Sequence, residues 1–336
     1  MTAYLLPFFL LSFLTVLEDL NRLKGLLKNK FFYYFIALSF ILFIGLRSEI
    51  GCDWLRYEQM FEKLSSKSFL DILINNFVSG PNNVIKEFGH ILITLFSRNI
   101  YVLNLIYAII FVAPLFYYCS RIKRAYLSLL ISYPYYIVVV GMGAIRQAAC
   151  ISILMLSIFL VSKSKYLYHL LLTTFSLLIH QFSILFNCFL LIPLVPKILK
   201  GKLSKKYVLA SIVVLILFLY SSPSYLIKIY YYITIPSALL GEAKGAIFIW
   251  LINFFPSLIF LLNSRKFNFN PYLNQIFITF SIFVIAMLPL VFFKSVIAYR
   301  LLLYAFPSTI FITANIPDLK IFKIKSFYIV NSIIFI

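Results

Sequence analysis

Runs of apolar residues recur along this 336-residue chain, and each is followed by a short polar stretch. An α-helix needs about 20 residues to cross some 30 Å of hydrocarbon, and most of these runs approach that length. Backbone polar groups in lipid must be satisfied within each segment, so the runs are expected to be helices. We therefore predict an all-α, polytopic integral membrane helical bundle of about 11–12 transmembrane helices, a single domain over residues 1–336. The predicted spans are 3–17, 31–46, 100–119, 126–141, 146–161, 166–180, 182–195, 207–221, 246–262, 272–293, 296–316 and 327–336.

The composition excludes a soluble globular protein. Only 12% of the residues are charged and the mean hydropathy is +1.00, whereas soluble domains carry about 25% charged residues. Residues 1–17 lack the basic region and cleavage site of a signal peptide, so they are predicted to remain as a span. The four cysteines, which form neither a disulfide framework nor a zinc pattern, are interpreted as small buried hydrophobic residues. They are Cys52, Cys119, Cys150 and Cys188.

The distribution of basic residues predicts the orientation in the membrane. Alternate linkers hold 19 of the 30 lysines and arginines, and cytoplasmic loops are typically the basic ones. Seven of the ten acidic residues fall on the other side. The net charge of +20 is therefore concentrated where it meets anionic membrane lipids, and no nucleic-acid partner is expected. The predicted cytoplasmic linkers are 18–30, 120–125, 162–165, 196–206, 263–271 and 317–326.

Two predicted external loops are long, 47–99 and 222–245. In the first, apolar residues recur at helical spacing over 83–96, which indicates an amphipathic helix along the outer interface. His90 lies on its polar face and is expected to be solvated. The second loop carries a tyrosine cluster that is typical of interface anchors, although stacking on sugar rings is an open alternative. Its members are Tyr225, Tyr230, Tyr231 and Tyr232.

Polar residues from at least four separated parts of the chain fall at the predicted outer ends of spans, which favours one shared external site. Taken singly, an arginine such as Arg56, or Lys294, is also consistent with contact to lipid phosphates. His180 is also consistent with a structural role in a tight helical hairpin, and His169 is interpreted as structural. The candidate residues are Arg47, Asp53, Arg56, Tyr57, Arg146, Gln147, His180, Gln181, Lys294, Tyr299 and Arg300.

This set suits the recognition of a lipid-linked diphosphate and the transfer of the group attached to it. Arginine offers planar, permanently charged donors to phosphate oxygens, so Arg47, Arg146 and Arg300 are suited to stabilising a departing pyrophosphate. A base is needed if a sugar hydroxyl attacks, and the candidates are His180 and Asp53. The sequence contains no Gly-rich phosphate loop, no His-Glu-x-x-His and no Gly-x-Ser-x-Gly. We predict no metal and no cofactor.

Several motifs resemble those of a known family. Gly51-Cys52-Asp53 followed by Tyr57, with Arg47 upstream, resembles the Arg…Gly-Thr-Asp…Tyr signature of the EpsG family, the Wzy-like polymerases of exopolysaccharide, capsule and O-antigen. Cys52 stands where the family usually has threonine. Three further patches agree in order and spacing, over about residues 41–304: Ile145-Arg146-Gln147, His180-Gln181-Phe182-Ser183, and Tyr299-Arg300-Leu301 with Tyr304.

The resemblance implies a polysaccharide polymerase, a multi-pass glycosyltransferase of the bacterial cytoplasmic (inner) membrane whose active site faces the periplasm or exterior. Its substrates would be undecaprenyl-diphosphate-linked oligosaccharide repeat units, with glycan transferred to the non-reducing end of the next unit. A chain-length regulator and a flippase are the implied protein partners. The catalytic residues would be His180, Asp53 and Arg146. Substrate would bind at Arg47, Tyr57, Arg146, Gln147, Tyr299 and Arg300.

Three other functions remain open at this point. A flippase or transporter of lipid-linked oligosaccharide would be equally hydrophobic, but it is expected to carry charges at several depths and often an internal repeat. A membrane acyltransferase would need a nucleophile or a histidine-based site, and the chain has three histidines. A glycan ligase or related membrane glycosyltransferase shares the donor chemistry. We expect substrate specificity to reside in loops 47–99 and 222–245.

Overall fold

The structure is a computed structural model in which the described residues are 2–20, 30–51, 53–65, 88–180, 182–194, 230, 234 and 243–318. Regular structure in these ranges is helical, without a strand, so the predicted all-α membrane fold is confirmed. The α-helices are α1 (Thr2–Asp19), α2 (Lys30–Gly45), α3 (Trp54–Ser65), α5 (Phe88–Phe96), α6 (Ile100–Ser120), α7 (Ala125–Ser132), α8 (Gly141–Gly143), α9 (Ile145–Ser162), α10 (Tyr166–Ile179), α11 (Ser183–Leu191), α16 (Ala246–Asn263), α17 (Pro271–Ala286), α18 (Leu288–Phe293), α19 (Ser295–Leu302) and α20 (Phe306–Asn315). The π-helical segment is η1 (Tyr133–Val140), and the 3₁₀ turns are η2 (Ile192–Leu194), η3 (Ser264–Phe267), η4 (Leu303–Ala305) and η5 (Ile316–Asp318).

In the described part of the chain, five helical segments are long and apolar enough to cross a membrane. They are Ile100–Ser120, Ala125–Gly143, Ile145–Ser162, Ala246–Phe267 and Ser295–Asn315, and shorter apolar helices are Lys30–Gly45, Tyr166–Ile179 and Pro271–Ala286. Ten of the twelve predicted spans correspond to helices. The other two, 207–221 and 327–336, lie outside the described residues, as does most of the loop 222–245.

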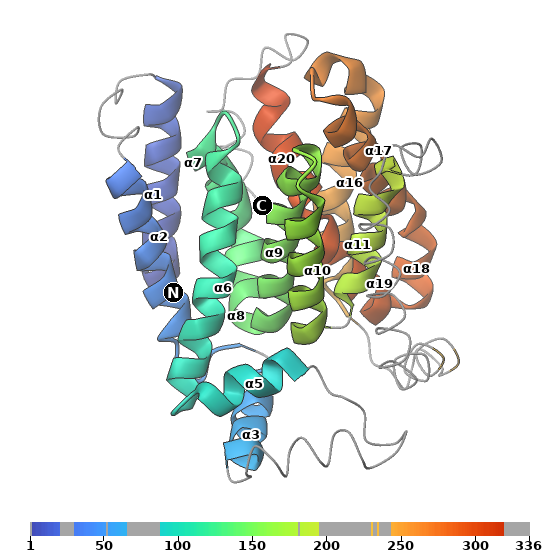
Figure 1. The fold of residues 1–336 in the computed structure, drawn as a ribbon. Coiled ribbons are helices and arrows are strands. Elements are labelled where there is room, and N and C mark those ends of the chain that lie inside the picture. The colour runs from blue at the N-terminus through green and yellow to red at the C-terminus, as the bar shows by residue number, and fades with distance from the viewer. Residues whose placement is uncertain are drawn as a thin grey trace.

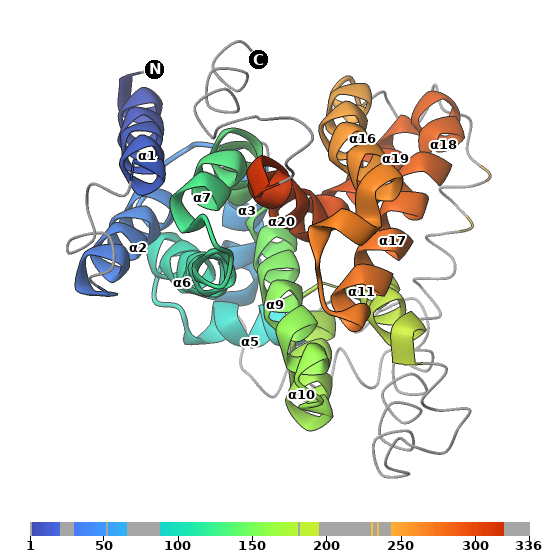
Figure 2. The same cartoon turned by 90° about the horizontal axis from the view of Figure 1, so that it is seen from above.

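The long helices lie side by side, and the short helices α3 and α5 lie together at one end of the bundle (Figure 1). We call this the α3–α5 end. The helix α6 packs against α2 and α9, and α9 also contacts α10 and α20. Figure 2 shows α9 between the N-terminal helices and the C-terminal group α16 to α19. Residues on α9 are therefore able to contact both halves of the molecule.

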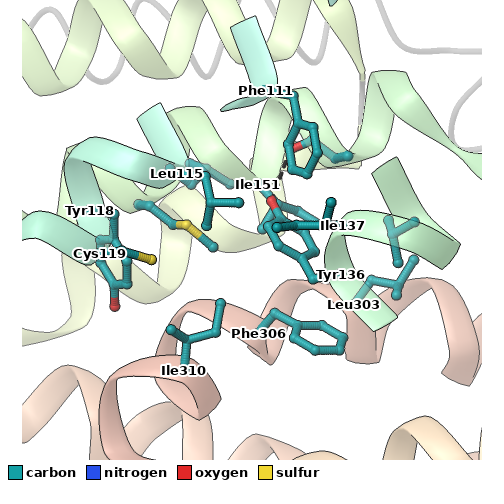
Figure 3. Packing of buried hydrophobic residues seen from close by; sticks show 14 of the residues in the cluster. Phe111, Leu115, Tyr118, Cys119, Tyr136, Ile137, Ile151, Leu303, Phe306 and Ile310 are labelled. Atoms are coloured by element: carbon teal, nitrogen blue, oxygen red, sulfur yellow. Dashed lines mark hydrogen bonds between the residues drawn. The ribbon is translucent and has the colours of Figure 1, made fainter. Parts of the chain in front are cut away.

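Aromatic side chains fill the centre of the bundle, where α6, η1, α9 and α20 meet (Figure 3). Tyr136 stacks on Phe306 with ring centroids 5.4 Å apart and meets Phe111 edge-on at 5.2 Å. Its hydroxyl donates to the backbone carbonyl of Ala148 at 2.9 Å. Helices in lipid gain little from burying apolar area against each other, because lipid tails are equally apolar. Ring packing and interhelical hydrogen bonds such as these therefore hold the helices in register.

At the opposite end of the bundle, α1 caps α7. The carboxylate of Glu18 accepts backbone hydrogen bonds from Ala125 at 2.9 Å and Tyr126 at 3.1 Å, and Arg124 pairs with Asp19 at 3.3 Å. The N-cap residue of α7 makes no side-chain capping bond of its own, so Glu18 satisfies N–H groups that the helix leaves unpaired. Contacts between the linkers 18–30 and 120–125, which were predicted to share a membrane face, thus lie at one end of the bundle.

Two very short junctions lie at the α3–α5 end. Ala144, with φ −132° and ψ 57°, separates α8 from α9, and Lys294, with φ −145° and ψ 62°, separates α18 from α19. Each junction starts a new helix at this end. Arg146 is the second residue of α9, and Arg300 lies in the second turn of α19. The short junctions therefore hold both arginines close to the same end of the bundle.

Candidate functional site

The loop between α2 and α3 is fixed by Arg47. The Arg47 guanidinium is buried and donates to the carbonyl of Ile44 at 2.9 Å, the carbonyl of Ile50 at 3.3 Å and Asn104 Oδ1 at 3.3 Å. Burial lowers the pKa of Arg47 to about 10, so the side chain remains charged at neutral pH. Arg47 thus ties the loop to the first turns of α6.

Gly51 brings this loop against the junction before α9. Its φ of +108° is a conformation that residues with a Cβ rarely adopt, and a Cβ there would lie 2.1 Å from the carbonyl oxygen of Met142. The glycine in the Gly-Cys-Asp motif is thus required both by its backbone conformation and by this close approach. Cys52, which follows it, lies outside the described residues.

Asp53, Tyr57 and Arg146 form a chain of contacts between α3 and α9. The hydroxyl of Tyr57 donates to Asp53 Oδ2 at 3.4 Å and accepts from Arg146 Nε at 3.4 Å. The guanidinium carbon of Arg146 also lies 5.1 Å from the centroid of the Tyr57 ring, a cation–π contact. The phenol of Tyr57, which is 4% exposed, therefore positions both the carboxylate and the arginine.

His90 belongs to this cluster, and the prediction that it is solvated is wrong. Its side chain is 1% exposed, its Nδ1 lies 2.7 Å from the hydroxyl of Tyr107, and its ring lies 6.2 Å from that of Tyr57. Burial, and to a smaller extent the charge of Arg146, lower the pKa of His90 to about 3. The imidazole is therefore neutral at physiological pH. The physical reason is packing, because α5 contacts α3, α6 and α10, and a Cβ on Gly89 would lie 3.0 Å from the backbone of Leu178.

A second set of contacts starts at the next residue of α9. Gln147 is 6% exposed, and its amide nitrogen donates to the backbone carbonyl of Arg300 at 2.9 Å. Tyr299 lies beside Gly245, where a Cβ would be 3.4 Å from the Tyr299 ring. The neighbours Arg146 and Gln147 thus connect the α3 side of the site to α19.

His180 is the C-cap residue of α10, and its side chain contacts η4, the turn that follows α19. Its backbone is extended, with φ −151° and ψ 114°, and its Nδ1 lies 3.2 Å from the hydroxyl of Tyr304. Tyr304 is four residues after Arg300, about one helical turn. The neighbouring Gln181 lies outside the described residues, and His169 is buried within α10.

These contacts join the predicted residues into two linked groups. One group comprises Arg47, Asp53, Tyr57 and Arg146, and the other comprises Gln147, His180, Tyr299 and Arg300. Sequence reasoning missed His90, Asn104 and Tyr107 as members. Asn104 and Tyr107 are three residues apart in an otherwise apolar helix, which puts them on one face. This spacing could have indicated a polar contact of α6 with the site.

The chemical resources of the site are cationic and phenolic. In the described residues no three His, Cys, Asp or Glu side chains gather in a metal-binding arrangement. Three buried polar atoms around the first group, Trp54 Nε1, His90 Nε2 and Asn104 Nδ2, have no hydrogen-bond partner among the described residues. Buried polar atoms are nearly always bonded, so these atoms mark places where a polar ligand is favoured.

Comparison with known proteins gives one match. A model of the EpsG family matches residues 30–336, which includes every candidate site residue. A search of curated proteins finds no match, and a search of solved structures finds none. The resemblance seen in the sequence motifs is confirmed by the family match.

Proposed function

Because the chain belongs to the EpsG family, we propose that it is a polysaccharide polymerase of the bacterial inner membrane that uses undecaprenyl-diphosphate-linked repeat units. The family is one of membrane proteins related to exopolysaccharide polymerases, with glycosyltransferase-like activity. The observation that carries the proposal is the contact chain from Asp53 through Tyr57 to Arg146, with Gln147 bonded to the backbone of Arg300. It links a carboxylate and a cation through one phenol at one end of a helical bundle.

In the proposed reaction, Arg146 and Arg300 bind the donor diphosphate. Planar guanidinium groups offer paired donors to phosphate oxygens and stabilise the charge that develops as the diphosphate leaves. Arg47 contributes by holding the loop, since each of its three nitrogens already donates to the protein. The unpaired buried atoms Trp54 Nε1 and Asn104 Nδ2 would donate to sugar or phosphate oxygens.

The transfer step exchanges one bond for another. The bond between the anomeric carbon of the donor glycan and the diphosphate oxygen breaks, and its electron pair leaves with undecaprenyl diphosphate. A hydroxyl oxygen at the non-reducing end of the acceptor bonds to that carbon, and its proton passes to a base. The candidate bases are His180 and Asp53, and Tyr57 holds the Asp53 carboxylate in place. Arginines supply the positive charge that a metal ion would otherwise bring.

The test is the length of the surface glycan in a strain that lacks this protein and carries variants of it. Arg146→Lys keeps a positive charge but loses the paired donors, so long chains are expected to be reduced at least tenfold relative to single repeat units. His180→Gln is expected to give the same pattern if His180 is the base. The matched control is Arg98→Lys, because Arg98 is exposed near the same end between α5 and α6. Membrane levels of every variant are measured.

Three outcomes would argue against the proposal. A wild-type distribution of glycan lengths in Arg146→Lys and His180→Gln, at equal protein level, would show that these residues do not take part in the reaction. Lipid-linked repeat units trapped on the cytoplasmic side of the deletion strain would indicate a flippase or transporter instead. Polymerised glycan that accumulates on its lipid carrier would indicate a ligase.

A further inference from the structure

A groove lies between α6 and α9, far from the candidate site. Its volume is about 420 Å³, within the range of about 300–1,000 Å³ that is typical of small-molecule sites. Both helices start at the α3–α5 end, and Asn104 and Tyr107 of α6 belong to the site. The groove residue Tyr117 is 13 positions after Asn104, which corresponds to about 20 Å along a helix. The lining residues are Ala113, Pro114, Tyr117, Leu156, Phe159, Leu160, Lys163 and Lys165.

The floor of the groove is apolar, and the sequence of α6 explains the hollow. Ala113 and Pro114 place two short side chains next to each other, opposite the larger Leu156 and Phe159 of α9. Pro114 also lacks an N–H and interrupts the hydrogen bonding of the helix. The surface between the two helices is therefore recessed, and the side chains of Ala113, Pro114, Leu156 and Phe159 give this part of the groove a hydrocarbon lining, which suits an acyl chain.

The mouth of the groove is cationic. Lys163 and Lys165 follow α9 and are exposed, and the guanidinium of Arg121 lies 4.7 Å from the centroid of the Tyr117 ring and donates to its hydroxyl at 2.9 Å. In the described part of the chain, no carboxylate pairs with any of these three cations, whereas the nearby Arg124 is paired with Asp19. Two exposed lysines thus line one end of the groove, and a third cation, Arg121, contacts the lining residue Tyr117.

We propose that this groove binds one anionic phospholipid, with an acyl chain on Ala113, Pro114 and Phe159 and its headgroup phosphate on Lys163, Lys165 and Arg121. Charge complementarity selects the occupant, because basic pockets between membrane helices attract anionic headgroups. The linker 162–165 is one of those that the basic-residue distribution assigns to the cytoplasm, so the lipid comes from that leaflet. The site is separate from the proposed reaction and does not depend on it.

The experiment is native mass spectrometry of the purified protein titrated with phosphatidylglycerol. The variant Lys163→Gln/Lys165→Gln is expected to weaken binding of the tightest lipid at least tenfold. The matched control is Arg265→Gln/Lys266→Gln, which removes two exposed cations at the same end but outside the groove, and it is expected to change that affinity less than twofold. Equal losses of affinity in the two variants would mean that binding depends only on the general surface charge, and would overturn the proposal.

A second variant tests the hollow itself. Ala113→Trp fills the recess and leaves the cations in place, so it is expected to weaken the same binding at least tenfold, and Ala113→Leu serves if the larger residue prevents folding. Unchanged binding in the folded variant would overturn the proposal. Displacement of the lipid by millimolar inorganic phosphate would identify a small-anion site instead. Tighter binding of undecaprenyl phosphate than of phosphatidylglycerol would identify a polyprenyl lipid as the occupant, also against the proposal.

Discussion

At the scale of single residues, each polar side chain of the site is defined by what it contacts. Arg47 and Arg146 are both arginines near span ends, yet Arg47 is bonded to two backbone carbonyls and Asn104, whereas Arg146 lies on the Tyr57 ring. The first arrangement builds the loop, and the second presents a cation next to the Asp53–Tyr57 pair. An arginine in lipid is costly, and these protein partners are what make its position favourable.

His90 gives a prediction for the pH dependence of stability. Its pKa is lowered from 6.5 to about 3 on folding, so the unfolded state takes up the proton first as the pH falls. The stability is therefore complete above pH 6.5 and is lost progressively between pH 6.5 and 3. By about pH 5.5 the loss from this group is about 1.4 kcal/mol. Thermal melting in detergent is expected to show a wild-type Tm that falls over this range more steeply than that of His90→Gln.

The matched control is His180→Gln. This variant retains His90, so its Tm is expected to keep the part of the acid-induced fall that is due to His90. The quantity compared is the change of Tm between about pH 8 and about pH 5.5, so a uniform destabilisation by the substitution does not matter. Equal pH dependence in the wild type and His90→Gln would show that His90 is not buried in the native protein.

At the scale of elements, the site depends on junctions rather than on helix interiors. The loop 47–51 meets α8 at Gly51, and a single residue, Ala144, separates α8 from the start of α9. These junctions set the relative positions of Asp53 and Arg146. Helical propensity does not determine such contacts, because they join segments about 90 residues apart in the sequence.

Gly51→Ala is therefore expected to be damaging. The φ of +108° strains any residue with a Cβ by about 1–2 kcal/mol, and the Cβ would also meet the Met142 carbonyl oxygen at 2.1 Å. We expect a lower Tm in detergent and a loss of long surface glycan chains. Gly245→Ala is the matched control, because its Cβ would make an ordinary 3.4 Å contact with Tyr299 and its φ of −79° is unstrained. Wild-type behaviour of Gly51→Ala would contradict the observed loop position.

At the scale of the whole molecule, the bundle has two chemically different ends. The α3–α5 end carries the candidate site, whereas the opposite end carries the capped start of α7 and the basic mouth of the groove. The basic-residue distribution assigns this opposite end to the cytoplasm. A periplasmic site and a groove facing the cytoplasmic leaflet both follow from this proposed orientation.

Cysteine labelling in spheroplasts measures the orientation directly. In a variant lacking the four native cysteines, Arg98→Cys is expected to react with a membrane-impermeant maleimide in intact spheroplasts. Lys266→Cys is expected to react only after permeabilisation, and both positions are exposed in the structure. The reverse pattern would place the candidate site in the cytoplasm and would remove the periplasmic reaction from the proposal.

The sequence by itself determined the class of the protein, most helix positions and the family. These follow from local physical requirements: hydrocarbon demands long apolar helices, and the motifs around Asp53, Arg146, His180 and Arg300 are short and continuous. That these residues lie at one end of the bundle was also predictable. Consecutive membrane-spanning helices run in opposite directions, so every second connection between them lies at the same end. Within the described ranges, ten predicted spans were found as helices.

The tertiary structure alone decided which of these residues touch. The burial of His90 against Tyr107, the contact of Tyr57 with Arg146 and the bond from Gln147 to the Arg300 carbonyl each join different helices. An amphipathic pattern cannot distinguish a polar face in water from one packed on other polar side chains, which is why the prediction for His90 was wrong. Pairings between helices depend on the shapes of side chains distant in sequence, and those are fixed only when the bundle packs.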